Sequence, residues 1–138
     1  MRRLLTSVAF ALSLAPAALA AGNLASQPTT LNLAVDTRAL AFSEVRFELE
    51  TGKYYKWVIT SDGFEEIMLQ APELFRNSWI NQIVISDLEV HMFGAPFGVE
   101  FDDEGDITIF FIPLRPGDYD FYVPGYEDRG LRGTFVVR

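Results

Sequence analysis

Apolar and polar residues alternate in short stretches along most of the chain. The clearest stretches are residues 31–36 and 54–60, and turn residues such as Thr51-Gly52-Lys53 separate one stretch from the next. Alternation with a period of two is typical of strands that bury one face, whereas the continuous apolar run 107–112 predicts a central strand. Strands are expected in the following ranges: 31–36, 42–49, 54–60, 64–69, 79–85, 88–92, 107–112, 118–123 and 134–137.

Helical periodicity is almost absent from the sequence. Only residues 71–76 predict a helical turn, because Pro72 stands near the start, where its missing N–H is harmless. Seven or more short strands separated by turns indicate an all-β sandwich. We find no internal repeat and no low-complexity linker, so the sequence predicts one domain.

The first twenty residues have the pattern of an export signal. Two arginines precede an apolar stretch that is too short to span a bilayer, and Ala18-Leu19-Ala20 offers a signal peptidase site. No later run is apolar enough to insert into a membrane, and the short Leu/Ala core is typical of bacteria, so we expect a periplasmic protein. The predicted segments are a signal peptide at 1–20, cleaved after Ala20; a leader and first strand at 21–36; and the β-sandwich at 37–138.

Charge and cysteine content narrow the possible functions. The chain has 19 Asp and Glu against 11 Lys and Arg, a net charge of −8, and the two arginines of the signal leave the exported part more acidic still. This balance argues against nucleic acid or an anionic membrane as a partner, and favours cations, basic proteins or simple solubility. The chain has no cysteine, which excludes disulfides and all thiolate chemistry.

The last third of the chain carries a distinctive layout of Pro-Gly pairs and aromatic residues. An aromatic strand, Asp118 to Tyr122, runs into Pro124-Gly125-Tyr126, then Gly130-Leu131-Arg132-Gly133 and a last strand. This layout resembles the copper loop of the cupredoxin family, in which an aromatic strand leads to Cys, Pro-Gly-His and Gly-Met-x-Gly. The likeness extends over residues 42–138 and implies a cupredoxin-like Greek-key β-sandwich.

The resemblance fails at each copper ligand. The Cys that normally follows the aromatic strand is missing, and the loop is shorter there, with Val123 directly after Tyr122. Tyr126 stands where the second His would be, and Leu131 stands where the Met would be. The upstream His position falls within residues 65–67, which contain no His. Because a blue-copper site requires a thiolate, type 1 copper and its electron transfer are excluded.

His91 is the only histidine of the chain and the first candidate metal ligand. Strand spacing places Glu89 and His91 on one face and Met92 on the other. One His and one carboxylate are too few for a tight divalent site, so further donors would come from Glu65, Glu66, Tyr126 or an acidic loop. The alternatives are a solvent-facing Glu–His pair and a Met92 that fills the core instead of offering its thioether to Cu(I).

Two further clusters of oxygen donors stand out. Tyr126 with Asp120, Glu127 and Asp128 would suit Fe(III), although Tyr126 could equally fill the space left by the lost His. The acidic run at 100–106 lacks the spacing of an EF-hand loop and predicts an acidic turn.

No arrangement of nucleophile and base is visible, so we predict that the chain is not an enzyme. The leading hypothesis is a monomeric periplasmic protein that binds copper or iron through a non-blue site. The alternative is a metal-free interaction module, in which exposed aromatic residues of the 119–126 loop dock a basic or membrane-bound partner. The candidate metal ligands are Glu66, Glu89, His91, Met92 and Tyr126.

Overall fold

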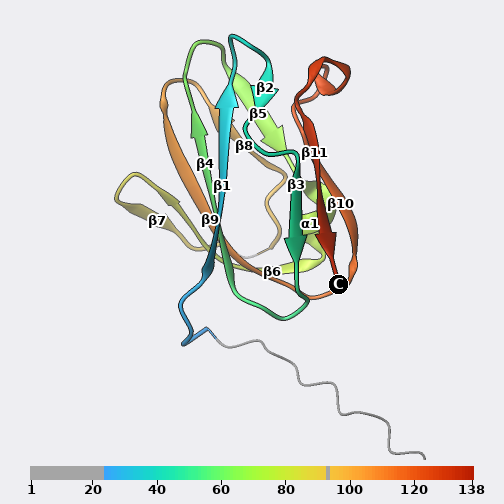
Figure 1. The fold of residues 1–138 in the computed structure, drawn as a ribbon. Coiled ribbons are helices and arrows are strands. Elements are labelled where there is room, and N and C mark those ends of the chain that lie inside the picture. The colour runs from blue at the N-terminus through green and yellow to red at the C-terminus, as the bar shows by residue number, and fades with distance from the viewer. Residues whose placement is uncertain (1–23, 93) are drawn as a thin grey trace, which may run out of the picture.

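The computed structural model describes residues 24–92 and 94–138, which form two β-sheets packed face to face (Figure 1). The predicted signal peptide lies outside the described residues. The six-stranded sheet has the order β2-β1-β4-β9-β6-β7. Its strands are β1 (Thr29–Asp36), β2 (Ala41–Phe42), β4 (Tyr55–Ser61), β6 (Ser78–Ile85), β7 (Leu88–Val90) and β9 (Gly105–Pro113).

The five-stranded sheet has the order β3-β11-β10-β5-β8. Its strands are β3 (Arg46–Leu49), β5 (Ile67–Gln70), β8 (Gly98–Phe101), β10 (Gly117–Tyr122) and β11 (Arg132–Val137). The helix α1 (Pro72–Arg76) and the 3-10 turn η1 (Glu127–Arg129) complete the described fold. The predictions of an all-β sandwich and of a helical turn within residues 71–76 are therefore confirmed, whereas the 3-10 turn η1 was not predicted.

Both sheets mix parallel and antiparallel pairs. β1 runs parallel to β4, from Thr29 opposite Tyr55 to Val35 opposite Ser61, and β3 runs parallel to β11. The other pairs are antiparallel, including β9 with β4 on one side and β6 on the other. The first strand is thus an inner strand of the six-stranded sheet, and β9 lies inside the same sheet, as its apolar sequence predicts.

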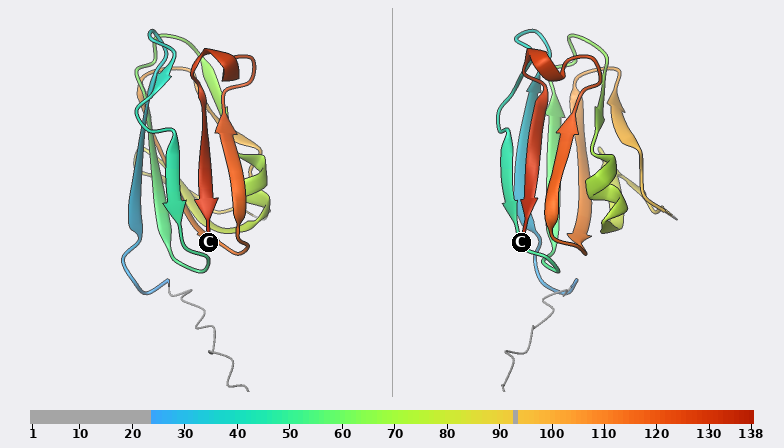
Figure 2. Two further views of the ribbon diagram at one scale, coloured as in Figure 1. Left: turned by 45° about the vertical axis from the view of Figure 1, so that its right-hand side comes forward. Right: turned by 90° about the vertical axis from the view of Figure 1, so that its right-hand side faces the viewer.

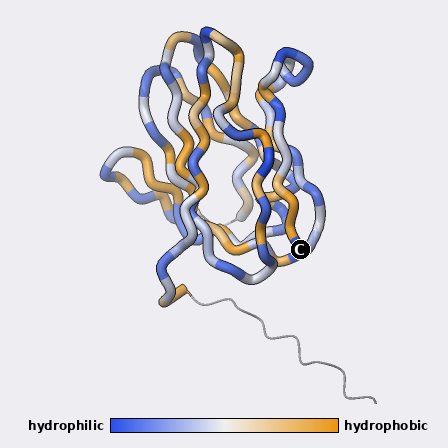
Figure 3. Tube along the Cα trace, in the orientation of Figure 1, coloured by the Kyte–Doolittle hydropathy of each residue, from blue (hydrophilic) through white to orange (hydrophobic). Residues whose placement is uncertain are grey.

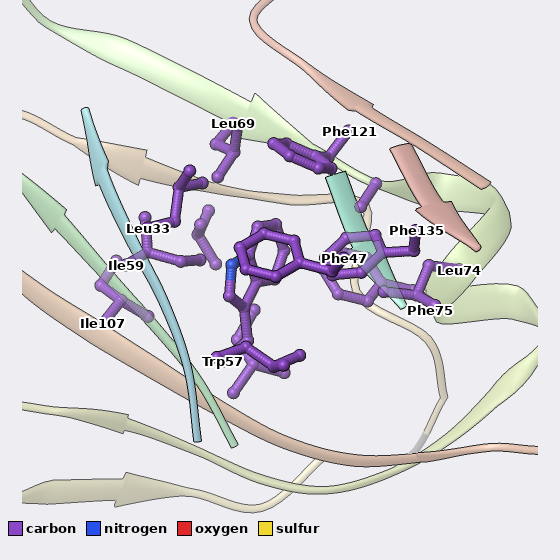
Figure 4. Packing of buried hydrophobic residues seen from close by; sticks show 14 of the residues in the cluster. Leu33, Phe47, Trp57, Ile59, Leu69, Leu74, Phe75, Ile107, Phe121 and Phe135 are labelled. Carbon is purple, nitrogen blue, oxygen red and sulfur yellow. The ribbon is translucent and has the colours of Figure 1, made fainter. Parts of the chain in front are cut away.

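Aromatic side chains fill the space between the sheets (Figure 4). Trp57 of β4 is fully buried, and its ring centroid lies 4.9 Å from that of Phe135 and 5.6 Å from that of Phe121. Helix α1 adds Leu74 and Phe75 to this core. Since the chain has no disulfide, burial of these large rings supplies much of its stability.

Three of the predicted strands are divided or shortened in the structure. The range 42–49 divides into β2 and β3, because the Glu44 carboxylate accepts the backbone N–H groups of Val45 and Arg46 and holds a loop. The range 64–69 narrows to β5, and the strand predicted at 88–92 ends at Val90, so that His91 and Met92 lie beyond it.

The sequence-based prediction did not include strand β8, which begins at Gly98. Glycine inside a short stretch normally indicates a turn. Here a Cβ at Gly98 would lie 2.8 Å from the carbonyl oxygen of Leu69, so the close approach of β5 and β8 requires glycine.

The hairpin of β6 and β7 projects from one side of the sandwich (Figure 1). The chain end and the start of β1 lie at one end of the sandwich, and η1 lies at the other (Figure 2). Among the described residues, no helix is long and apolar enough to cross a membrane.

Candidate functional site

The loop that resembles the copper loop in sequence, residues 123–131, lies at the end of the sandwich that carries η1. Backbone hydrogen bonds close this loop: Val123 N–H donates to Leu131 O at 3.0 Å, and Leu131 N–H donates to Tyr126 O at 3.2 Å. Tyr126 N–H donates to Val123 O at 3.0 Å. Backbone hydrogen bonds therefore join the two ends of the loop.

The interior of this loop is apolar. Leu131 is completely buried, Val123 is 3% exposed, and both belong to the core. Of the residues in the upstream range 65–67, Ile67 is buried at the start of β5, whereas Glu65 and Glu66 are exposed. An apolar side chain offers a metal ion no donor, so Val123 and Leu131 contribute none inside the loop.

Tyr126 lines a shallow hollow near Thr37, Phe64 and Glu65, and it is 36% exposed. The Arg129 guanidinium lies 5.3 Å above the Tyr126 ring, and the Arg38 guanidinium lies 3.7 Å above the Phe64 ring. Two cation–π contacts place positive charge in the hollow, and Glu65 adds a carboxylate to its lining. The hollow beside Tyr126 therefore contains side chains of both charges.

Asp120, one of the oxygen donors expected beside Tyr126, has other partners. Asp120 binds Arg132 at 2.5 Å, from the Nη2 atom to the Oδ2 atom, and it also accepts the hydroxyl of Thr134 at 2.9 Å. The neighbouring Asp120 raises the pKa of Arg132, first through the hydrogen bond and then through its charge. Asp120 therefore serves the pairing of β10 with β11, and it does not face an iron site.

A buried threonine anchors the other wall of the hollow. The Thr37 hydroxyl donates to Asp62 Oδ1 at 2.6 Å and accepts the backbone N–H of Glu65 at 3.0 Å. Thr37 is only 2% exposed, and its backbone N–H also donates to Asp62 at 3.1 Å. The hydroxyl bond is the main reason that the pKa of Asp62 lies below its ordinary value.

Glu89 and His91 come together as the strand spacing predicts. His91 Nε2 lies 3.5 Å from Glu89 Oε2 at the end of β7, and the side chains are 68% and 56% exposed. This geometry allows a shared metal ion and equally a solvated ion pair. Met92 is 38% exposed and borders a hollow with Phe75 and Trp79, so it does not fill the core.

Glu66 belongs to a different cluster. Its carboxylate and those of Glu100 and Asp102 offer oxygen atoms that all lie within 4.8 Å of one another, and all three residues are exposed. In the described part of the chain, this is the one group of three or more His, Asp or Glu side chains with such spacing. In the antiparallel pair of β5 and β8, Ile67 lies opposite Phe101. This register brings Glu66 close to Glu100 and Asp102, the neighbours of Phe101.

The five predicted metal ligands thus occupy separate places. Glu89 and His91 form a pair at the end of β7, and Met92 borders the hollow beside Phe75 and Trp79. Glu66 joins the acidic cluster beside β8, and Tyr126 lies in the η1 loop. The sequence-based prediction did not bring Glu66 together with the acidic run at 100–106, because it did not include strand β8. Alternation from Val99 to Phe101 was the available signal.

The prediction that exposed aromatic residues of the 119–126 loop dock a partner is wrong for most of these residues. Tyr119 is buried, and its hydroxyl donates to the carbonyl oxygens of Arg115 and Pro116, while Phe121 is fully buried in the core. Of the aromatic residues in the 119–126 loop, Tyr126 alone is exposed. Large apolar side chains are exposed instead on the hairpin, at Ile85, Leu88 and Val90.

The fold is similar to those of known copper proteins. The chain aligns with the multicopper oxidase McoA of Aquifex aeolicus at a TM-score of 0.60 and 11% identity, over 80% of this chain and 29% of the enzyme. A laccase of Pediococcus acidilactici gives 0.62 and 8%, over 88% of this chain and 29% of the laccase. The chain therefore spans less than a third of either enzyme.

An auracyanin aligns over nearly its full length. Auracyanin of Roseiflexus castenholzii matches at a TM-score of 0.52 and 20% identity, over 82% of this chain and 99% of the auracyanin. No protein-family model matches the sequence, and no curated protein matches it. The structure has a cupredoxin-like fold, and the absence of cysteine removes the type 1 copper site from it.

Proposed function

We propose that this chain is an exported, non-catalytic cupredoxin-like protein that binds another protein and carries no metal in the copper loop. The observation that supports this most strongly is the apolar filling of that loop. Leu131 and Val123 are buried where ligands would lie, and the loop is closed by its own backbone bonds. A sandwich that keeps its loops without the metal is a rigid scaffold for binding.

Export to the periplasm is part of this proposal and derives from the pattern of residues 1–20. The mass of the protein recovered from the periplasm checks it, since cleavage after Ala20 leaves a chain that begins at Ala21. Recovery of the full-length chain in the cytoplasm would contradict it.

The partner is best sought by affinity capture from periplasmic extract. The immobilised protein should retain the same partner, identified by mass spectrometry, with and without EDTA, because no metal takes part. Raised salt should weaken retention, since the acidic chain attracts a basic partner. Retention of nothing beyond what an unrelated acidic protein retains would remove the proposal.

Copper binding is the second candidate, and one distance favours it. His91 Nε2 and Glu89 Oε2 lie 3.5 Å apart on an exposed strand end, close enough to share one ion. Calorimetric titration with Cu(II) should then show binding at about micromolar affinity that is lost in His91→Ala. Glu48→Ala is the matched control, because Glu48 is a similarly exposed carboxylate on β3. Absence of binding, or binding that survives His91→Ala, would exclude this site.

A further inference from the structure

The apolar face of the β6–β7 hairpin extends beyond the core. Ile83 lies opposite Val90, and Ile85 lies opposite Leu88, so that all four side chains share one face. Ile83 is buried in the core, whereas Leu88 is 72% exposed, Ile85 43% and Val90 42%. In Figure 3 the apolar colouring continues from the sandwich into this hairpin. The face that is buried at Ile83 is therefore uncovered at the hairpin's end.

The outer edge of β7 is also open. β7 is the last strand of the six-stranded sheet, and in the described part of the chain it pairs with β6 alone. An antiparallel strand directs half of its backbone N–H and C=O groups away from its neighbour. Of the features that usually guard an edge strand, Leu88-Glu89-Val90 has a short length and one charged residue, but no Lys and no Pro. This edge can accept another strand.

The charge around the hairpin selects the kind of partner. Between Arg76 and Arg115, a stretch that contains β6, β7 and β8, the sequence has no Lys or Arg. All charged side chains of this stretch other than His91 are therefore acidic. Asp87 and Glu89 flank Leu88 directly. A second copy of this chain, with a net charge of −8, would be repelled, as would an anionic lipid surface. A basic segment would be attracted.

We propose that β7 binds an extended segment of a basic partner protein, which adds to the sheet as a further strand. Apolar side chains of the segment would cover Leu88 and Val90, and its Lys or Arg residues would pair with Asp87 and Glu89. This inference rests on the proposed function as a binding module and assigns the surface that module uses.

A phage library of random short peptides, selected on the immobilised protein, tests this surface without a known partner. Enriched peptides should alternate apolar residues with Lys or Arg. A synthetic enriched peptide should bind Leu88→Asp at least about tenfold more weakly than the wild type, because the substitution removes apolar contact at the centre of the face. The same peptide, N-methylated on alternate residues, should lose binding, because it cannot complete a strand ladder.

Val45→Asp is the matched control, since Val45 is 52% exposed and precedes β3 of the other sheet. It should leave the affinity unchanged within about twofold, and the thermal midpoints of both variants should confirm that they are folded. Enrichment of acidic peptides, full binding by Leu88→Asp, or full binding by the N-methylated peptide would overturn the proposal.

Two further measurements exclude the other occupants. Sedimentation that shows dimers lost in Leu88→Asp would indicate a second copy, and binding to phosphatidylglycerol vesicles lost in that variant would indicate a membrane. Either outcome overturns the assignment to a basic segment. If Leu88→Asp still captures the periplasmic partner, the hairpin is not the docking surface but the proposed function stands.

Discussion

At the scale of single residues, burial decides what replaces each copper ligand. Val123 and Leu131 lie inside the loop and are apolar, whereas Tyr126 lies at its rim and keeps a polar hydroxyl. A buried donor with no metal to bind would be left unsatisfied at a cost of about 1–3 kcal/mol, and an apolar residue avoids that cost. The sequence sufficed to predict the loss of these ligands, because the ligand types themselves are missing.

Also at the residue scale, the sequence predicts contacts within one strand but not contacts between strands. Spacing of two along a strand predicted that Glu89 and His91 meet, and they do. No spacing rule links Glu66 to Glu100 and Asp102, since these acids meet through the pairing of two strands far apart in sequence. Contacts across a sheet depend on topology, which the local pattern does not contain.

The Thr37 hydroxyl provides a prediction on pH. Thr37→Val removes the bond that is the main cause of the lowered pKa of Asp62, so this pKa should rise toward its ordinary value. A carboxyl group with a lowered pKa stabilises the fold above its unfolded pKa, and this contribution is lost as pH falls through the folded pKa. The stability difference between wild type and Thr37→Val should therefore be larger at neutral pH than near about pH 3.

NMR titration of the Asp62 carboxyl and urea unfolding at both pH values measure these effects. Thr60→Val is the control, because Thr60 is exposed at the end of β4 and should leave the pKa of Asp62 unchanged. An Asp62 pKa that stays equally low in Thr37→Val would show that the hydroxyl is not its cause.

At the scale of elements, long strands with clear alternation were predictable and short ones were not. The buried pattern of β4, with Tyr55, Trp57 and Ile59 on one face, follows directly from the sequence. The hairpin was also predicted, but its alternation indicated a buried face, and the structure leaves β7 exposed throughout. A pattern shows which side chains share a face, and only the other sheet decides whether that face is covered.

The hairpin turn provides a second prediction. Ser86, the first residue of the two-residue turn, has a φ of 55°, a region that non-glycine residues adopt at a cost of about 1 kcal/mol or more. Glycine adopts this φ freely but is more flexible in the unfolded chain. Ser86→Gly should therefore stabilise the protein by about 0.5–1 kcal/mol, as measured by urea unfolding.

Ser43→Gly serves as the comparison for Ser86→Gly. Ser43 does not have a positive φ, and its hydroxyl accepts the backbone N–H of Ala34 at 2.8 Å, so glycine there should destabilise the protein. Equal effects of the two substitutions would show that the turn at Ser86 carries no strain.

At the scale of the whole molecule, stability comes from the aromatic core, and this gives a test of metal dependence. The chain has no disulfide, and the described carboxylate cluster lies on the surface, so EDTA should leave the thermal midpoint unchanged within about 1 °C. A tightly held ion would behave differently. At a concentration a hundred times its dissociation constant, a metal that binds only the folded state adds about 2.7 kcal/mol.

In a domain of this size such a contribution raises the midpoint by several degrees, so thermal unfolding would detect it. A midpoint that falls by more than about 5 °C in EDTA would contradict a metal-free protein. His91→Ala and Glu100→Gln would then locate the ion, because the first removes the ligand on the hairpin and the second removes one from the acidic cluster. If only one variant loses the EDTA-induced fall of the midpoint, the ion binds at the site changed in that variant. If both variants retain it, the ion binds elsewhere.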